Sequence, residues 1–378
     1  MTTNSPHTQS GLSGKASIDT GDPAVPDWWI YRCTDEQHDG ISRLPGAPPW
    51  RSFTGGPPRE DLLDASEFSD SARHRNYSRY VQASRYQAER ADIHLVNLSL
   101  LLRRPLLVTG SPGVGKSTLA YSIAHELQLG PVLRWPVTSR ATLHDGLYQY
   151  DAIGRLQEMG LTERVAERHH PRGTRRTSGR KRAMPPDIGR YLRLGPLGTA
   201  LLPWRTPRVL LIDEIDKSDV DFPGDLLHVF EEGEFTVPEL ARLHQPKAKV
   251  MTADDEGWVE LRRGRVQCHE FPIVVMTSNE EREFSPAFLR RCVRLDIKQP
   301  NAAKLERLLA AHLPPRESAH PTLRTDMVAQ FLRKQDDEGA ALANDQLLNA
   351  VRIAELLRGG KEEHDLIVEH LLRPLNEE

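Results

Sequence analysis

The apolar residues of this chain gather in short runs that predict the strands of an α/β core. The clearest runs are Pro105–Thr109, Arg208–Asp213 and Phe271–Asn279, each with a continuous apolar centre. Such runs between turn signals are typical of strands that are covered on both faces. Ser117–Leu127 follows the first run, and its apolar residues recur at helical spacing. The pattern predicts a three-layer α/β fold with a parallel sheet.

Helical spacing also marks the segments before and after this core. Ser78–Leu102 fits one helix that leads into the first strand. After Pro300 the apolar residues share helical faces, which predicts a small α-helical lid over residues 300–378. The residues on these faces are Leu305, Leu308, Leu309 and His312, and then Leu347, Leu348, Val351 and Leu356.

A region inserted in the core, about residues 234–270, alternates between apolar and polar positions. Glu234–Val237, Trp258–Leu261 and Arg265–Cys268 each show the period of a short strand, and Arg262–Arg265 offers a turn. We therefore expect a hairpin region here, within a core that covers residues 76–299.

The glycine-rich string after the first strand matches the P-loop pattern G-x-x-x-x-G-K-[ST]. Gly110, Gly113 and Gly115 allow backbone N–H groups to turn towards a phosphate at a helix N-terminus. Lys116 is expected to reach the β- and γ-phosphates, and Ser117 to hold Mg²⁺. The expected nucleotide-binding residues are Gly110, Ser111, Pro112, Gly113, Val114, Gly115, Lys116, Ser117 and Thr118.

The second apolar run ends in two carboxylates, which is the Walker B form. Asp213 is expected to hold the water shell of Mg²⁺, and Glu214 to polarise the water that attacks the γ-phosphate. Nearby, Asp216–Asp219 resembles a guanine-reading motif but lacks its Asn. We therefore expect ATP rather than GTP as the nucleotide, with Mg²⁺ as the metal.

The third run ends at Asn279, whose amide can position the lytic water. Downstream, Ser285 followed by proline is a helix start signal, and the helix leads to Arg290 and Arg291. A permanently charged, planar guanidinium suits the charge that develops on a γ-phosphate. Only one of the two arginines needs to act in this way, and a solvated helix end is the alternative.

These motifs, in this order and spacing, resemble those of an AAA+ ATPase, and their details resemble the MoxR branch. The likeness is to bacterial MoxR-type ATPases that accompany von Willebrand factor A proteins in multi-gene conflict systems. It covers about residues 75–300 well. The strings that carry the finer likeness are Leu133–Arg140, Asp145–Gly154, Leu194–Leu201 and Glu231–Glu239.

The resemblance implies roles for particular residues. Asn279 is similar to the sensor 1 residue, and Arg291 to the arginine finger that completes a neighbouring subunit's site. The resemblance therefore implies a hexameric ring that remodels a protein partner, and it points to a partner with a von Willebrand factor A domain. The chain departs from the family at Asp345, where a sensor 2 arginine usually stands; Arg352 is a weak substitute.

The segment of residues 1–75 is rich in Pro, Gly, Ser and Asp, and we expect a largely irregular arm. It nevertheless carries two aromatic clusters, Trp28–Tyr31 and Trp50–Phe53. Either these anchor a partner, or the arm wraps its own domain.

A second insertion, about residues 155–190, contains the basic block Arg164–Arg182. Such a block is most often a solvated loop, although it could bind nucleic acid or an acidic partner. His169 and His170 lack the further ligands that a metal site needs.

Composition fits an intracellular protein. The 378 residues carry 50 Lys and Arg against 53 Asp and Glu, so net charge gives no case for nucleic acid. Three cysteines without clamp spacing fit a reducing compartment, and no apolar leader or membrane span is visible. We expect a cytoplasmic enzyme. Two other functions remain open: a nucleic-acid-stimulated motor, and a nucleotide-controlled scaffold with slow hydrolysis.

Overall fold

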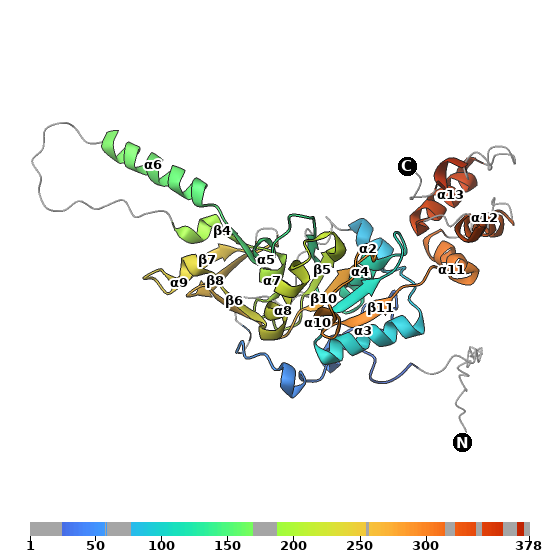
Figure 1. The fold of residues 1–378 in the computed structure, drawn as a ribbon, viewed down its shortest axis with the longest axis horizontal. Helices are drawn as coiled ribbons and strands as arrows, with labels where there is room; N and C mark the ends of the chain where they lie inside the picture. Colours follow the sequence, from blue (N-terminus) through green and yellow to red (C-terminus); the bar gives the residue numbers. More distant parts are fainter. Residues whose placement is uncertain are drawn as a thin grey trace, which may run out of the picture.

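The computed structural model describes residues 25–56, 58, 77–168, 187–254, 257–313, 322–337, 342–357 and 369–373. Figure 1 shows the core between two flanking parts, with helix α6 and the second sheet at one end and the helices α11 to α13 at the other. None of the helices in the described ranges has the length and apolarity that crossing a bilayer requires.

The core is a five-stranded sheet in the order β11-β1-β10-β5-β2, with every neighbouring pair parallel. The three predicted apolar runs form its central strands, which confirms the expected fold class. The strands are β1 (Leu106–Thr109), β2 (Leu133–Pro136), β5 (Val209–Asp213), β10 (Ile273–Thr277) and β11 (Val293–Asp296).

Helices cover both faces of this sheet. Leu106 and Val108 of β1 pack with α3 and α4 on one face, whereas Leu107 packs with α7 and α8 on the other. This alternation follows from the two-residue period of a strand. The covering helices are α3 (Arg90–Leu102), α4 (Lys116–Glu126), α7 (Pro196–Ala200) and α8 (Phe222–Glu232). Shorter helices, α5 (Leu143–Leu147) and α10 (Pro286–Leu289), connect strands.

The expected single helix over Ser78–Leu102 is wrong, because the chain forms two. Helix α2 covers Tyr77–Ala83, and α3 begins at Arg90. Glu89 starts α3 through a capping box: its backbone N–H donates to Asp92 Oδ2 at 3.1 Å. A capping box satisfies the free N–H groups of a new helix, so the chain restarts there instead of continuing.

The hairpin region forms part of a second sheet in the order β3-β4-β7-β8-β9-β6. The three predicted strands are present with the turn between β8 and β9, and β7 is an additional strand that the pattern did not predict. The elements are β3 (Tyr148–Tyr150), β4 (Leu192–Leu194), β6 (Glu234–Thr236), β7 (Lys247–Met251), β8 (Trp258–Arg262), β9 (Arg265–Gln267) and helix α9 (Pro238–Ala241).

Part of the predicted basic loop is helical: α6 covers Ala152–Arg168 and extends away from the second sheet (Figure 1). The chain re-enters the described part at the short 3-10 helix η4 (Ile188–Tyr191). Most of the basic block, including His169, His170 and the arginines that follow, lies outside the described residues.

The helical lid consists of α11 (Ala302–His312), α12 (Leu323–Asp337) and α13 (Asn344–Leu357). Leu305 and Leu309 are buried in its core together with Leu347 and Val351, as predicted. Leu356 is not, since 47% of its surface is exposed.

The N-terminal arm packs on its own domain at its first aromatic cluster. Trp29 and Tyr31 are 2% and 0% exposed. The buried Asn97 of α3 accepts the N–H groups of Ile30 at 2.6 Å and Tyr31 at 3.0 Å, and donates to the Tyr31 carbonyl at 2.7 Å. The arm was expected either to anchor a partner or to wrap its own domain, and this packing matches the second alternative. Trp50, in the 3-10 helix η2 (Pro49–Arg51), is 75% exposed.

Candidate nucleotide site

The P-loop joins the end of β1 to the start of α4, and its glycines are needed by the backbone. Gly110, Gly113 and Gly115 have φ angles of 138°, 77° and 99°. Those angles favour glycine. A Cβ on Gly110 would collide with the Ile297 carbonyl, and one on Gly113 with Ala343 at the lid. The loop can therefore adopt this turn only with glycine at these positions.

Lys116 links the P-loop to the end of β10. Its Nζ donates to the carbonyls of Gly110 at 2.6 Å and Ser111 at 2.9 Å, and to Asn279 Oδ1 at 2.7 Å. Burial lowers the pKa of Lys116, and the nearby carboxylates of Asp216, Glu214 and Asp213 oppose this. The predicted Walker A lysine and sensor 1 asparagine thus lie in direct contact.

Asp213 is the centre of a second network. Its Oδ1 accepts the hydroxyls of Ser117 at 2.6 Å and Thr277 at 2.9 Å, and Oδ2 accepts Nη2 of Arg134 at 2.8 Å. Burial raises the pKa of the Asp213 carboxyl, but these hydrogen bonds outweigh it and hold the pKa below its ordinary value. Asp213 is therefore an anion that faces the P-loop serine.

Glu214 has a left-handed backbone, with φ of 61°. Its N–H donates to Thr277 Oγ1 at 2.9 Å, and its half-exposed carboxylate accepts Nζ of Lys217 at 2.9 Å. For a residue with a Cβ this conformation costs about 1–2 kcal/mol, and such outliers cluster at functional sites. The strand end turns Glu214 away from the buried β5 and towards solvent.

Asp216 holds the backbone next to Asn279. Its Oδ2 accepts the N–H of Asn279 at 2.7 Å and of Glu281 at 3.3 Å. In the sequence, Asp216 belongs only to an imperfect guanine motif, and no motif marks Arg134 or Thr277. A local signal exists for Arg134 alone of these three residues. It is the exposed position between buried Leu133 and Trp135 in the alternating strand β2.

The candidate finger arginines do not meet the P-loop within this chain. Ser285 caps α10 as predicted, its Oγ accepting the Phe288 N–H at 3.3 Å. Arg290 is exposed at the end of this helix. Arg291 donates from Nε to Glu231 Oε1 at 2.8 Å and from Nη1 to the Ala287 carbonyl at 3.2 Å. Both arginines therefore lie on the outside of their own domain.

The lid reaches the P-loop through its backbone. The N–H of Asn344, at the start of α13, donates to the Gly113 carbonyl at 3.2 Å. Asp345 is exposed in the first turn of α13, and Arg352 is exposed two turns later. Neither makes a hydrogen bond to the P-loop among the described residues.

The donor set fits Mg²⁺ bound together with a nucleotide. The Ser117 hydroxyl and the Asp213 carboxylate offer the hard oxygen ligands that Mg²⁺ prefers. Within the described residues no group of three or more His, Cys, Asp or Glu side chains could hold a metal ion. The remaining ligands would have to come from phosphate and water, as is usual for Mg²⁺.

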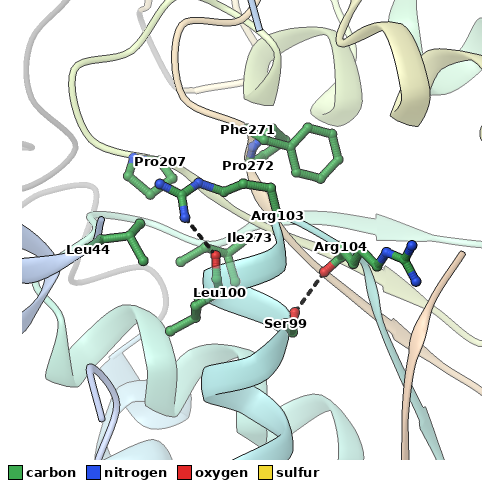
Figure 2. A pocket seen from close by; sticks show the side chains of 9 residues that line it. All are labelled: Leu44, Ser99, Leu100, Arg103, Arg104, Pro207, Phe271, Pro272 and Ile273. Carbon is green, nitrogen blue, oxygen red and sulfur yellow. Dashed lines mark hydrogen bonds between the residues drawn. The ribbon is translucent and has the colours of Figure 1, made fainter. Parts of the chain in front are cut away.

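A small hollow lies at the opposite edge of the sheet, where β5 and β10 begin. Leu44, Arg103, Pro207, Phe271 and Ile273 line it (Figure 2). Arg103 donates there to the Leu100 carbonyl at 2.9 Å (Figure 2). The lining of this hollow contains no P-loop or Walker B residue, so the hollow is not part of the nucleotide site.

A parallel sheet of this order, with a P-loop after β1 and carboxylates after β5, defines a P-loop nucleotide-binding domain of the AAA+ class. Residues 105–292 match the family model described as AAA domain (dynein-related subfamily). The matched segment includes the P-loop, Asp213, Glu214, Asn279 and both candidate finger arginines.

Among solved structures, a mutant of RuvB from Thermotoga maritima is similar to this chain. It is 14% identical with a TM-score of 0.39, over 75% of this chain and 70% of that one. No curated protein matches the chain.

Proposed function

We propose that this protein binds and hydrolyses ATP and uses the energy to remodel a protein partner as a ring-shaped AAA+ oligomer. The observation that carries the proposal is the convergence of three separate motifs: Lys116 Nζ lies 2.7 Å from Asn279 Oδ1, and Ser117 Oγ 2.6 Å from Asp213 Oδ1. Groups for phosphate, metal and water thus come from strands β1, β5 and β10 to one edge of the sheet, where α/β proteins bind ligands.

Each side chain has a role in an in-line attack on the γ-phosphate. Lys116 would leave the carbonyls of its own loop to neutralise phosphate oxygens, and Ser117 and Asp213 would hold Mg²⁺, which would supply further positive charge. Glu214 would turn from Lys217 to orient the attacking water, and the Asn279 amide would help to position that water. Gly110, Gly113 and Gly115 present backbone N–H groups to the phosphates.

The finger is proposed to act between subunits. Arg291 is bound to its own α8 and α10, so it would serve the site of a neighbouring copy. Arg290 is the second candidate. A hexamer with a von Willebrand factor A partner is the finer proposal, and it rests on the MoxR resemblance. In this proposal residues 1–75 form the arm, 76–299 the ATPase core and 300–378 the lid.

The alternative of a slow, nucleotide-controlled scaffold is favoured by one observation. The lid meets Gly113 through the backbone of Asn344, and the sensor 2 position holds the exposed Asp345. A lid without an arginine on the γ-phosphate would close on nucleotide without accelerating hydrolysis. Turnover that no protein partner can raise would favour this scaffold, and stimulation by single-stranded DNA would favour a nucleic-acid motor.

The deciding experiment is steady-state ATPase activity together with mass determination, on the wild type and on Glu214→Gln. We expect ATP-dependent rings for both proteins and loss of hydrolysis in the variant. Monomers whose hydrolysis is unchanged by Glu214→Gln would refute both the role of Glu214 and the ring.

A further inference from the structure

The carboxylate of Glu231, in the last turn of α8, is shared by two arginines from distant parts of the chain. Its Oε1 accepts Nε of Arg291 at 2.8 Å, and its Oε2 lies 3.8 Å from Nη1 of Arg51. Arg291 is the proposed finger, whereas Arg51 belongs to the N-terminal arm. One acidic side chain therefore connects the arm to the finger.

Arg51 is held in a built environment. Its side chain is 8% exposed, Nη2 donates to the Arg103 carbonyl at 2.6 Å, and the guanidinium lies 5.1 Å from the Phe271 ring centroid. Burial lowers the pKa of Arg51, and the charge of Glu231 opposes this. A buried cation needs a carboxylate partner, so Arg51 keeps Glu231 turned towards it.

The arm around Arg51 is also fixed to the second sheet, and we call residues 49–56 the strap. Phe53 stacks on Phe271 with ring centroids 5.0 Å apart. Gln267 Nε2 donates to Thr54 Oγ1 at 2.8 Å, and a Cβ on Gly55 would collide with the Cys268 carbonyl. These contacts place the strap against the end of α8 and against β9, so Arg51 cannot move independently of them.

Glu231 and Ala287 together restrain the finger. They accept hydrogen bonds from Nε and Nη1 of Arg291, whereas Nη2 makes none among the described residues. The side chains of Arg291 and Glu231 are 34% and 42% exposed, and ion pairs this open contribute little to stability. Their consequence is orientational, because a free arginine side chain carries about 2 kcal/mol of rotamer entropy.

We propose that Glu231 is the positioning residue of the arginine finger, and that the strap, through Arg51, is what positions Glu231. The N-terminal arm is then a working part of the ATPase site of the neighbouring subunit. This inference rests on the proposed function of Arg291. It requires that loss of Glu231 affects turnover more than nucleotide binding, since the finger contacts the transition state.

The test compares full-length Glu231→Ala with Glu232→Ala, an exposed glutamate one residue further along α8. With kcat and KM for ATP measured on assembled protein, we expect Glu231→Ala to lower kcat about tenfold, since misplacing a catalytic group costs rate. KM is expected to stay within about twofold, because binding in the ground state is unchanged. Glu232→Ala is expected to match the wild type.

Two further variants separate positioning from a general structural effect. Glu231→Gln keeps an oxygen that can accept from Arg291 Nε, so kcat is expected to recover part of the loss. Arg51→Met keeps an apolar side chain beside the stacked rings of Phe53 and Phe271 but frees Glu231, and is expected to lower kcat with KM unchanged. If Glu231→Ala does not fold, the comparison is made between Glu231→Gln and Glu232→Gln.

Arg291→Ala distinguishes a failure of the finger assignment of Arg291 from a failure of the positioning role of Glu231. If it keeps the kcat of the wild type, the finger assignment fails and this inference is overturned with it. If it abolishes turnover with nucleotide binding retained, but Glu231→Ala behaves like Glu232→Ala, the finger stands and only the positioning role is refuted.

Discussion

Asn97 offers the sharpest test of how the arm is held. Its buried side chain makes four hydrogen bonds, to the N–H groups of Ile30 and Tyr31 and to the carbonyls of Tyr31 and Ile93. Asn97→Ala removes all four and leaves the two N–H groups and the Tyr31 carbonyl without this partner. Each buried polar group left unsatisfied costs at least about 1 kcal/mol, so the minimum loss is about 3 kcal/mol.

This loss should appear as a lower melting temperature. At about 2–4 °C per kcal/mol for a domain of this size, Asn97→Ala is expected to melt about 6–12 °C below the wild type. The loss cannot exceed the free energy that docks the arm, because beyond it residues 28–31 detach. Detachment would expose Trp29, so tryptophan emission should shift to the red, and trypsin should cut faster at Arg32.

The control is Asn349→Ala, an exposed asparagine on α13 that has no hydrogen bond among those described. It should leave melting and cleavage unchanged. If Asn97→Ala melted within about 1 °C of the wild type and stayed as resistant to trypsin, the four hydrogen bonds would not hold the arm, and the accounting of unsatisfied groups would be wrong.

Three shorter predictions follow from buried charges and thiols. Arg134→Gln removes a cation that lowers the pKa of Asp213, so Mg²⁺-dependent binding of a fluorescent ATP analogue should begin to fail at a higher pH than in the wild type. Asp254→Ala leaves the fully buried Arg208 without the carboxylate 2.8 Å from its Nη2, and unfolding by urea should show a loss of about 3 kcal/mol. Burial raises the pKa of Cys268 to about 12, so a thiol reagent should label it at pH 8 only after denaturation.

The direction of the pH shift expected for Arg134→Gln follows from the lowered pKa of Asp213. The ionised carboxylate is the form that binds Mg²⁺, and the wild type keeps it ionised to a lower pH than an ordinary aspartate. Without Arg134 the carboxyl takes up a proton earlier as the pH falls. The pH at which binding fails on the acid side is the quantity to compare. If it does not move in Arg134→Gln, or if it moves equally in Arg294→Gln on the opposite edge strand, the reasoning is contradicted.

Much of the core was predictable because its signals are local. Continuous apolar runs identified β1, β5 and β10, and the polar residues at their ends identified Asp213, Glu214 and Asn279. Parallel strands bring their carboxyl ends to one edge of a sheet, so contact between these groups follows from the fold class itself.

What the sequence did not predict depends on register and on packing. Arg134 reaches Asp213 because β2 pairs with β5, with Pro136 opposite Asp213, and no local pattern specifies that pairing. Strand β7 alternates buried and exposed residues but was not predicted; lysines, which are depleted in strands, occupy its exposed positions. The break between α2 and α3 is set by a capping box around Glu89, which apolar spacing does not reveal.

The left-handed backbone at Glu214 means that the residue best for stability differs from the residue needed for the proposed activity. Glycine adopts φ near 61° without the penalty that a side chain incurs, so Glu214→Gly would relieve about 1 kcal/mol of strain while removing the proposed water-orienting carboxylate. Directed evolution for thermal stability alone would favour glycine at this strand end, whereas evolution for turnover would retain the costlier glutamate. Stabilised variants of this chain should therefore be sequenced at residue 214 before their activity is compared.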